Sequence, residues 1–285
     1  MKAGLIGLGG MGVGMARNLT NAGFLAGVYN RTRSKAETLA AELNVQVYDS
    51  PQTLAGQVDV VLMCVSADRD VLELVTAIME TIRPATSVVD MSTVSSATAQ
   101  LAANLLAAQK ADFLDAPVSG GVEGAKNGTL SMMVGGDADV LARIRPVLAA
   151  MTSRIEHMGV IGSGQACKAV NQIMCAGINQ AVTEALAFAA AQGLELEKVI
   201  DVISGGAAGN WFLDRRGKTM TQGVFQPGFK LALHHKDLLI CREMARQIGV
   251  ESPLTQATIH DYATLMQQGY GDEDISALYR LKRKQ

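Results

Sequence analysis

The chain begins with a short apolar stretch that runs directly into a glycine-rich turn. Residues 3–6 are Ala-Gly-Leu-Ile, and glycines follow with the spacing Gly7-x-Gly9-x-x-Gly12. Where a strand turns into a helix, the first glycine permits the tight turn. The second lets the backbone approach a pyrophosphate, and the third lets the helix pack on the strand. The helix N-terminus then offers unpaired N–H groups to the anion. The pattern predicts a dinucleotide site formed by Gly7, Leu8, Gly9, Gly10, Met11 and Gly12.

The end of the next apolar stretch indicates which dinucleotide is bound. Leu25–Tyr29 is followed by Asn30, Arg31 and Thr32. NAD-binding proteins usually carry an acidic residue here, which binds the ribose 2′-hydroxyl. An amide and a guanidinium suit a 2′-phosphate instead, because arginine makes charge-assisted hydrogen bonds to phosphate. These residues therefore predict NADP(H) in preference to NAD(H).

The same segment also fits a solvated loop. Arg31 and Arg33 would then be exposed charges in front of a helix that is capped by Ser34, with Glu37 completing a capping box. This interpretation is compatible with NADP(H) binding, so both are kept.

Composition narrows the class of protein. The 285 residues are 48% hydrophobic and carry a net charge of −2, so there is a large core and no basic surface for nucleic acid. The cysteines at 64, 167, 175 and 241 have neither C-x-x-C nor zinc spacing, which favours a reduced intracellular protein. Early glycines argue against a signal peptide, and no apolar run of about 18 residues predicts a membrane span. A cytoplasmic protein without nucleic acid, metal or membrane is expected.

The first half of the chain alternates short strands with helices. Strands are predicted at 2–6, 25–29, 45–48, 58–64, 87–90, 112–115, 130–134 and 154–157. Helices are predicted between most of them, at 11–22, 68–79, 97–108 and 138–151. Such alternation is typical of a mostly parallel sheet that is covered by helices on both faces.

The second half lacks strand patterns. One long helix is predicted at 164–191, and others at about 195–204, 209–220, 231–248, 253–268 and 273–282. The expected fold class is therefore α/β: a Rossmann-type NADP-binding domain over 1–162, joined by the long helix to an all-α domain over 163–285. Because the helical half is so apolar, a homodimer or homotetramer is expected, although a closed monomer also fits the composition.

Two later segments combine glycines with polar side chains. Asp115-Ala-Pro-Val-Ser119-Gly120-Gly121 exposes N–H groups beside a hydroxyl, as a carboxylate site would, but alone it is more typical of an ordinary turn. Lys168 and Asn171 share a face at the start of the long helix. A lone lysine there is usually a surface residue. Its pairing with an amide, among apolar neighbours and after two glycines, favours a catalytic role.

The adjacent charges Lys236 and Asp237 lie on a later predicted helix. They fit a pair of solvated charges as well as a carboxylate near Lys168. His234 and His235 precede them, but adjacent histidines point in different directions on a helix and no third ligand is evident. No metal site is predicted.

Together these motifs resemble the β-hydroxyacid dehydrogenases. That family includes 3-hydroxyisobutyrate dehydrogenase, tartronate semialdehyde reductase and the glyoxylate/succinic semialdehyde reductases. The resemblance covers essentially the whole chain, with the motifs in the family's order. They are Gly7–Gly12, Asp90-Met-Ser-Thr93, Asp115–Gly121, Gly164-x-x-x-Lys168-x-x-Asn171 and Lys236-Asp237-Leu238.

The resemblance implies that Lys168 is the catalytic acid/base. It implies a substrate-binding set consisting of Ser119, Gly120, Gly121, Asn171, Trp211, Phe229 and Asp237. It adds Cys64, Val65, Thr93 and Lys236 to the cofactor-binding residues. Asp237 would support Lys168, and Lys236 would lie over the nicotinamide end. Trp211 fits a core aromatic equally well.

The predicted activity is NADPH-dependent reduction of short semialdehyde or 2-oxo acids, such as glyoxylate, succinic semialdehyde and tartronate semialdehyde, to hydroxy acids. An ordinary lysine, with a pKa of about 10.4, is protonated at neutral pH and favours this direction. The alternatives are a 3-hydroxyisobutyrate-type dehydrogenase working oxidatively and a non-catalytic NADPH-binding scaffold.

Other enzymes of the same fold are less consistent with the sequence. Imine reductases lack the lysine that stands here at 168, and the helical half is too short for a 6-phosphogluconate dehydrogenase. A phosphorylated substrate would need a basic cluster, and the one present, Arg215, Arg216 and Lys218, is interpreted as surface charges.

Overall fold

The computed structural model describes residues 1–283. The chain divides into two compact units, Met1–Lys168 and the part from Ala169 onward. The division falls within the first two turns of α8 (Ser163–Ala191), whereas the boundary expected from the sequence lies at the start of that helix.

The N-terminal unit is built on a nine-stranded sheet, counted within residues 1–283, with the order β3-β2-β1-β4-β5-β6-β8-β7 and β9 beside β8. The strands are β1 (Ala3–Ile6), β2 (Leu25–Tyr29), β3 (Gln46–Val47), β4 (Val60–Met63), β5 (Ser87–Asp90), β6 (Asp112–Asp115), β7 (Val118–Ser119), β8 (Leu130–Gly135) and β9 (Thr152–Gly159). Strands β1 to β6 pair in parallel, and β8 runs antiparallel to β6 and β7. The predicted mostly parallel Rossmann-type sheet is confirmed.

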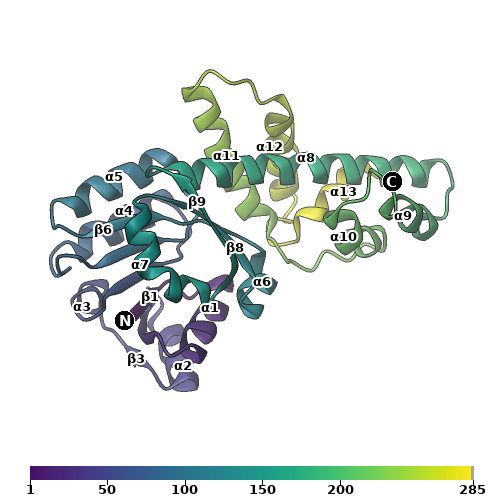
Figure 1. The fold of residues 1–285 in the computed structure, drawn as a ribbon. Coiled ribbons are helices and arrows are strands. Elements are labelled where there is room, and N and C mark those ends of the chain that lie inside the picture. Colours follow the sequence, from purple (N-terminus) through teal and green to yellow (C-terminus); the bar gives the residue numbers. More distant parts are fainter. Residues whose placement is uncertain (284–285) are drawn as a thin grey trace. The chain divides into compact units, whose positions relative to one another are not determined.

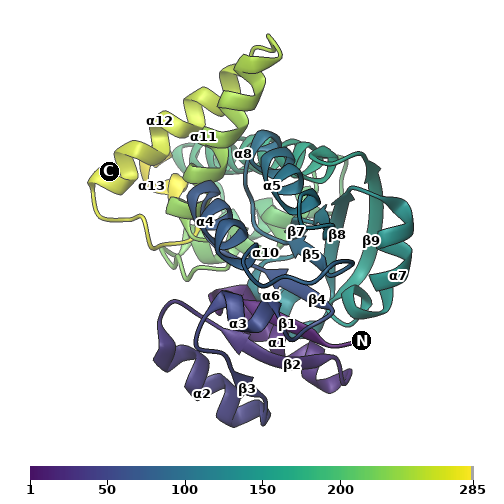
Figure 2. The same ribbon diagram turned by 90° about the vertical axis from the view of Figure 1, so that its left-hand side faces the viewer.

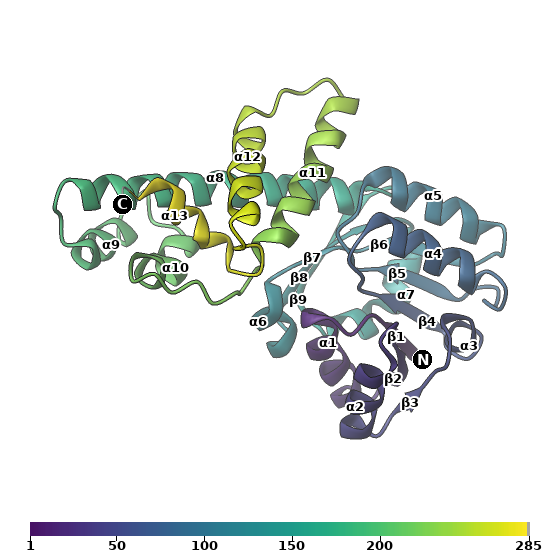
Figure 3. The ribbon, with the colours of Figure 1, turned by 180° about the vertical axis from the view of Figure 1, so that it is seen from behind.

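Helices cover both faces of this sheet. One core includes residues of α1 (Gly10–Asn21), α2 (Arg33–Leu43), α6 (Gly121–Asn127) and α7 (Ala138–Ala149). The other includes residues of α3 (Pro51–Ala55), α4 (Asp68–Ile78) and α5 (Ser96–Ala107). Figures 2 and 3 show α4 and α5 side by side. Along β4, Val60 and Leu62 enter the first core while Val61 and Met63 enter the second, because successive side chains of a strand point to opposite faces.

Two local predictions for this unit were wrong. The segment 115–121 is not a simple loop, because it contains β7 and the start of α6. Ser34 does not cap α2: the helix begins at Arg33, and Thr32 occupies the N-cap position without a side-chain cap bond. Glu37 accepts a hydrogen bond from Arg33 Nε at 2.7 Å instead of completing a capping box, since residues four apart on a helix surface are neighbours.

The C-terminal unit is helical, as predicted. After α8 come α9 (Leu196–Ser204), α10 (Trp211–Thr221), α11 (Leu231–Gln247), α12 (Pro253–Gln267), the 3-10 turn η1 (Ile275–Leu278) and α13 (Tyr279–Lys282). The single helix expected at 273–282 is thus a 3-10 turn followed by a short α-helix. Helices α11 and α12 form an antiparallel pair (Figure 1).

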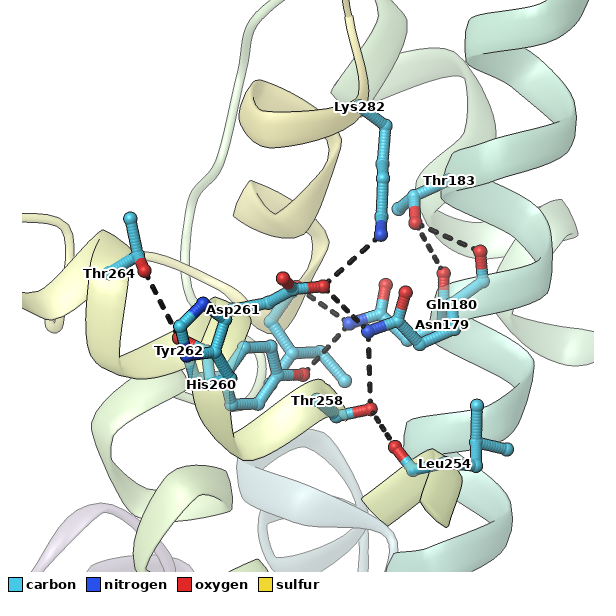
Figure 4. A network of polar contacts seen from close by, with 11 residues as sticks. Asn179, Gln180, Thr183, Leu254, Thr258, His260, Asp261, Tyr262, Thr264 and Lys282 are labelled. Atoms are coloured by element: carbon cyan, nitrogen blue, oxygen red, sulfur yellow. Dashed lines mark hydrogen bonds and ion pairs between the residues drawn. The ribbon is translucent and has the colours of Figure 1, made fainter. Parts of the chain in front are cut away.

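A polar network fastens α8 to the last helices of this unit (Figure 4). Asn179 Nδ2 donates to the Tyr262 hydroxyl and to the carbonyl of Ile275, both at 2.8 Å. Gln180 Nε2 donates to Asp261 Oδ2 at 2.9 Å, and Lys282 Nζ lies 3.1 Å from the same oxygen. Buried amides must be paired to avoid a desolvation penalty, so these bonds fix which face of α8 packs inward.

Helix α8 is also long and apolar enough to cross a membrane, if length and composition alone are considered. In the 18-residue stretch of α8 that is apolar enough, 39% of the residues are buried within the protein. The core helix of a globular protein meets the same criterion.

Candidate active site

The segments that follow β1, β2 and β4 meet at the carboxyl edge of the sheet. Gly7 has a φ of +97°, and a Cβ there would lie 2.2 Å from the carbonyl oxygen of Cys64. A Cβ at Gly12 would lie 2.0 Å from the carbonyl oxygen of Gly7. The Leu8 N–H donates to Asn30 Oδ1 at 2.9 Å. In open α/β sheets this edge, where the strand order reverses between β1 and β4, is where ligands bind.

Gly9 differs from its neighbours because the fold does not require it. It has an ordinary φ of −76° as the N-cap of α1, and a Cβ built there meets nothing within 4 Å. No side chain caps α1, and its first turn carries no acidic residue. Free space in front of an uncapped helix N-terminus fits an anion that comes close to the backbone. The predicted dinucleotide turn therefore fits the group it would hold.

Asn30 and Arg31 have different surroundings. Both ends of the Asn30 amide are engaged within the chain, because Nδ2 donates to the carbonyl of Thr32 at 2.9 Å while Oδ1 accepts from Leu8. The Arg31 side chain is 82% exposed, and its Nη1 lies 3.3 Å from Asp70 Oδ1. An exposed pair of this kind is weak. Arg31 can therefore turn toward a phosphate, while Asn30 fixes the shape of the turn.

The Ser119–Gly121 segment lies beside the glycine-rich turn. Helix α6, which begins at Gly121, packs on α1: Asn18 Nδ2 donates to the carbonyl of Ala125 at 2.7 Å. A Cβ at Gly10 would lie 3.2 Å from the side chain of Val122. Gly120 and Gly121 have φ values of +130° and +61°, which favour glycine. The structure thus brings together two motifs that are about a hundred residues apart in the sequence.

Lys168 is buried, with 7% of its surface exposed. Lys168 is therefore not a solvated surface residue, as a lone lysine near the start of a helix usually is. The start of its helix is held by the Asp115 carboxylate, which accepts N–H bonds from Gly162 at 2.7 Å and Gln165 at 2.9 Å. Burial raises the pKa of Asp115, and these two donors oppose that shift. Sequence reasoning missed Gln165 and this use of Asp115, whose only local signal is an acid ending an apolar strand.

The predicted cofactor residues Val65 and Thr93 lie on joined segments. Ser92 Oγ accepts a hydrogen bond from the N–H of Val65 at 2.9 Å, and the Ser92 N–H donates to Asp90 Oδ1 at 3.0 Å. The segment after β5 is therefore tied both to the segment after β4 and to the end of its own strand.

Asp90 is fully buried, and its Oδ2 has no hydrogen-bond partner within the described part of the chain. Burial raises its pKa from the usual 3.8 to about 6, with a smaller contribution from Asp115. Because the pKa is higher in the folded state, the neutral form of Asp90 contributes its full stability below about pH 3.8, the usual pKa. That stability is lost as the pH rises through about 6. The difference between the usual and the folded pKa corresponds to about 3 kcal/mol of stability that is lost by neutral pH.

We therefore expect Asp90→Asn to remove a pH dependence between about pH 4 and 6. Urea unfolding of the two proteins across this range gives the measurement, with Asp214→Asn, at an exposed position of α10, as the control. The stability of the wild type should fall relative to Asp90→Asn as the pH rises, by up to about 3 kcal/mol. Parallel profiles for the wild type and Asp90→Asn would show that Asp90 ionises without cost.

In the C-terminal unit, three predicted site residues are linked through Gln172, which the sequence reasoning missed. Asn171 Nδ2 donates to Gln172 Oε1 at 2.7 Å. Gln172 Nε2 donates to Asp237 Oδ2, also at 2.7 Å. Lys236 Nζ lies 2.8 Å from Asp237 Oδ1. Asp237 is buried, so Lys236 and Asp237 are not a pair of solvated charges.

Trp211 and Phe229 adjoin a second cluster in this unit. Arg216 lies over the Trp211 ring, 5.6 Å from its centre, and its Nε is 3.3 Å from the buried Asp274. Asp274 also accepts the Phe229 N–H at 3.1 Å. The interpretation of Arg216 as a surface charge was therefore wrong, because a buried carboxylate requires a partner. Trp211 is 62% exposed, which rules out a core aromatic.

The two histidines have different environments. His234 is fully buried, with Nδ1 3.1 Å from the Tyr262 hydroxyl and Nε2 3.2 Å from the carbonyl of Gln172. Its ring also packs 5.2 Å from that of Phe229. Burial lowers the pKa of His235. His234 thus contacts both Gln172, which bonds to Asn171 and Asp237, and the ring of Phe229.

Each half of the chain matches the model of a known protein family. Residues 2–162 match the model of the NAD-binding domain of 6-phosphogluconate dehydrogenase. Residues 162–282 match the NAD-binding model of NADP-dependent 3-hydroxyisobutyrate dehydrogenase.

Individual proteins are also similar to this chain over nearly its full length. The 2-hydroxy-3-oxopropionate reductase of Escherichia coli is 35% identical over 98% of this chain and 96% of its own. An uncharacterised oxidoreductase of Shewanella frigidimarina is 38% identical over 97% and 96%. The structure of 3-hydroxyisobutyrate dehydrogenase from Mycobacterium tuberculosis with L-serine matches with a TM-score of 0.91, at 33% identity and 99% coverage of each chain. With this agreement in sequence, fold and dinucleotide turn, the chain belongs to the β-hydroxyacid dehydrogenase family and is an NAD(P)-dependent hydroxyacid dehydrogenase.

Proposed function

We propose that the protein reduces short semialdehyde or 2-oxo acids to hydroxy acids with NADPH. Glyoxylate, succinic semialdehyde and tartronate semialdehyde are the substrates we expect. The observation that carries this proposal is the buried Lys168, in the same compact unit as the dinucleotide turn. A relative named for reduction of 2-hydroxy-3-oxopropionate, an aldehyde acid, supports the substrate class.

The preference for NADPH rests on Arg31. Its exposed guanidinium follows β2, where the position usually acidic in NAD-binding proteins is the uncharged Asn30. A structure with NADP⁺, 26% identical to this chain with a TM-score of 0.88, agrees with this preference.

Each candidate residue has a chemical task in this reaction. When bound, NADPH would supply the hydride that the carbonyl carbon accepts. Lys168, as an ammonium group, donates a proton to the carbonyl oxygen as it gains charge. The Ser119 hydroxyl and the N–H groups of Gly120 and Gly121 hold the substrate carboxylate.

The remaining residues bind and orient. Asn171 binds the substrate oxygen that becomes the hydroxyl, and Asp237 sets the direction of its neighbours by accepting from Gln172. Phe229 and Trp211 line the substrate side. Lys236 would contact the nicotinamide end, and Thr93, Val65 and Cys64 would line the cofactor.

The 3-hydroxyisobutyrate dehydrogenase of Mycobacterium tuberculosis favours a second candidate function, the oxidation of a 3-hydroxy acid. Neutral Lys168 would then accept the hydroxyl proton. A non-catalytic scaffold is disfavoured, because a scaffold has no use for a buried lysine whose helix start is clamped by Asp115.

We further propose that the protein acts in the cytoplasm as a homodimer or homotetramer. Exposed apolar side chains follow one face of α8, where Val170, Met174 and Phe188 are 58%, 61% and 65% exposed. A second copy of the chain would cover such a face.

Steady-state oxidation of NADPH against two- to four-carbon aldehyde acids tests the function. We expect turnover with NADPH well above that with NADH, and the best substrate reports the pocket size. Glyoxylate without NADPH, and a sugar phosphate with it, are the controls. Turnover only with NADH would refute the proposal that Arg31 binds the 2′-phosphate of NADPH. Turnover only of a 3-hydroxy acid would favour the oxidative alternative.

A further inference from the structure

One glutamine joins the helix that carries Lys168 to the segment that contains Thr93. Gln165 is 1% exposed. Its Nε2 donates to the carbonyl of Ser92 at 2.9 Å, and its Oε1 accepts from the N–H of Val94 at 3.2 Å. The two bonds are made to the residues on either side of Thr93. A single side-chain amide therefore pairs with both a backbone carbonyl and a backbone N–H of that segment, as a neighbouring strand would.

Both ends of this bridge are held in place. On the helix side, the Asp115 carboxylate accepts the N–H groups of Gly162 and Gln165. A Cβ at Gly164 would lie 2.5 Å from the carbonyl oxygens of Asp115 and Met133, so the backbone at the helix start packs closely against β6 and β8. On the other side, Ser92 is tied to Val65 and to Asp90 as described above.

The spacing along α8 connects this bridge to the chemistry. Lys168 lies three residues after Gln165, so the two share a helix face. Reduction of a carbonyl places a proton on the oxygen and a hydride on the adjoining carbon. The acid and the nicotinamide must therefore keep a fixed mutual position, and a misplacement of about 1 Å can lower a rate by about 10²-fold.

We propose that Gln165 is a positioning residue that sets Lys168 against the Ser92–Val94 segment lining the nicotinamide. The proposal rests on the proposed reductase function. Gln165 acts through Lys168 and Thr93 and transfers no proton itself, since both functional atoms of its amide are engaged by the backbone of residues 92 and 94.

Two variants separate the contributions of its two bonds. Gln165→Met keeps an unbranched side chain of similar length but makes neither bond. Gln165→Glu keeps an acceptor for Val94 and places a carboxylate against the carbonyl of Ser92. For Gln165→Met we expect kcat to fall by about 10- to 100-fold, and a smaller rise in the Kd for NADPH.

The isotope effect distinguishes positioning from loss of fold. With NADPH deuterated at the transferred position, a misplaced acid makes hydride transfer more rate-limiting, so the isotope effect on kcat should rise in Gln165→Met. A variant that is merely less folded would lose active molecules and keep the isotope effect of the wild type.

Gln180→Met is the matched control. It removes a buried glutamine from the same helix, together with bonds to Thr258 and Asp261 at 3.2 Å and 2.9 Å (Figure 4). We expect it to lower the thermal midpoint while kcat per folded molecule and the isotope effect stay unchanged.

Amide hydrogen exchange tests the bridge without relying on turnover. The Val94 N–H, which donates to Gln165, should exchange faster in Gln165→Met and as in the wild type in Gln180→Met. Wild-type exchange at Val94, or faster exchange with unchanged kcat and isotope effect, would overturn the proposal. If the wild type reduced no aldehyde acid, the proposed function would fail. In that case, unchanged exchange and unchanged NADPH affinity in Gln165→Met would overturn this inference separately.

Discussion

Replacing Lys168 with alanine should lower turnover of the best aldehyde acid by about 10²- to 10⁴-fold, the range for a positioned acid or base. The reason is that the carbonyl oxygen gains charge as hydride arrives, and Lys168 is the buried lysine proposed to protonate it. The binding of NADPH should persist, because the dinucleotide turn is formed by residues 7–12 and their neighbours rather than by the helix that carries Lys168.

Steady-state kinetics and NADPH titration together check this prediction. Lys168→Met retains the aliphatic stem and separates loss of charge from loss of packing. Lys198→Ala, at an exposed position of α9 where the lysine pairs with Glu195, is the control and should behave as the wild type. If Lys168→Ala bound NADPH and kept full turnover, the role assigned to Lys168 would be wrong.

Alanine at Gly9 should weaken NADPH binding by about 10- to 100-fold without lowering stability. The added Cβ meets nothing within 4 Å in the protein itself, and the backbone of Gly9 suits any residue. The methyl group would instead occupy the space in which a pyrophosphate approaches the backbone. Overpacking of this kind costs about 1–3 kcal/mol, and each 1.4 kcal/mol is about tenfold in affinity.

Gly7 provides the contrasting result. Its positive φ and the 2.2 Å approach of a Cβ to the carbonyl of Cys64 mean that Gly7→Ala should destabilise the fold itself. Gly56→Ala is the control, because φ is −69° there and the nearest atom to a Cβ is 3.5 Å away. Thermal unfolding and NADPH titration of the three variants give the test. Wild-type affinity in Gly9→Ala would contradict a pyrophosphate at this turn.

Much of the N-terminal unit could be predicted because its signals are local. The strands at 25–29, 87–90 and 112–115 were predicted with the observed bounds, since each is a short apolar run that ends at or just before a polar residue. The capping prediction at Ser34 failed because Arg33 and Glu37 pair across one helical turn and the helix starts earlier. Likewise, no local pattern distinguishes a glycine-rich loop from the short strand β7 followed by α6.

The roles of Trp211 and Arg216 could not be read from their neighbours in sequence. Arg216 is partly buried because Asp274, far along the chain, needs a positive partner in the core. Trp211 stands at the first position of α10, directly after the Asn210 cap, and is 62% exposed, whereas the next residue, Phe212, is buried. Burial depends on which elements pack together, and periodicity does not specify that.

The sequence alone determined the βα dinucleotide turn, the Rossmann-type alternation and the helical second half, because glycine spacing and hydrophobic periodicity act between residues close in the chain. Only the tertiary structure decided which side chains support the candidate residues. Gln165 bonds to Ser92 across 73 positions, and Gln172 bonds to Asp237 across 65. Such pairings form only when packing brings distant segments together, and burial then obliges each amide and carboxylate to find a partner.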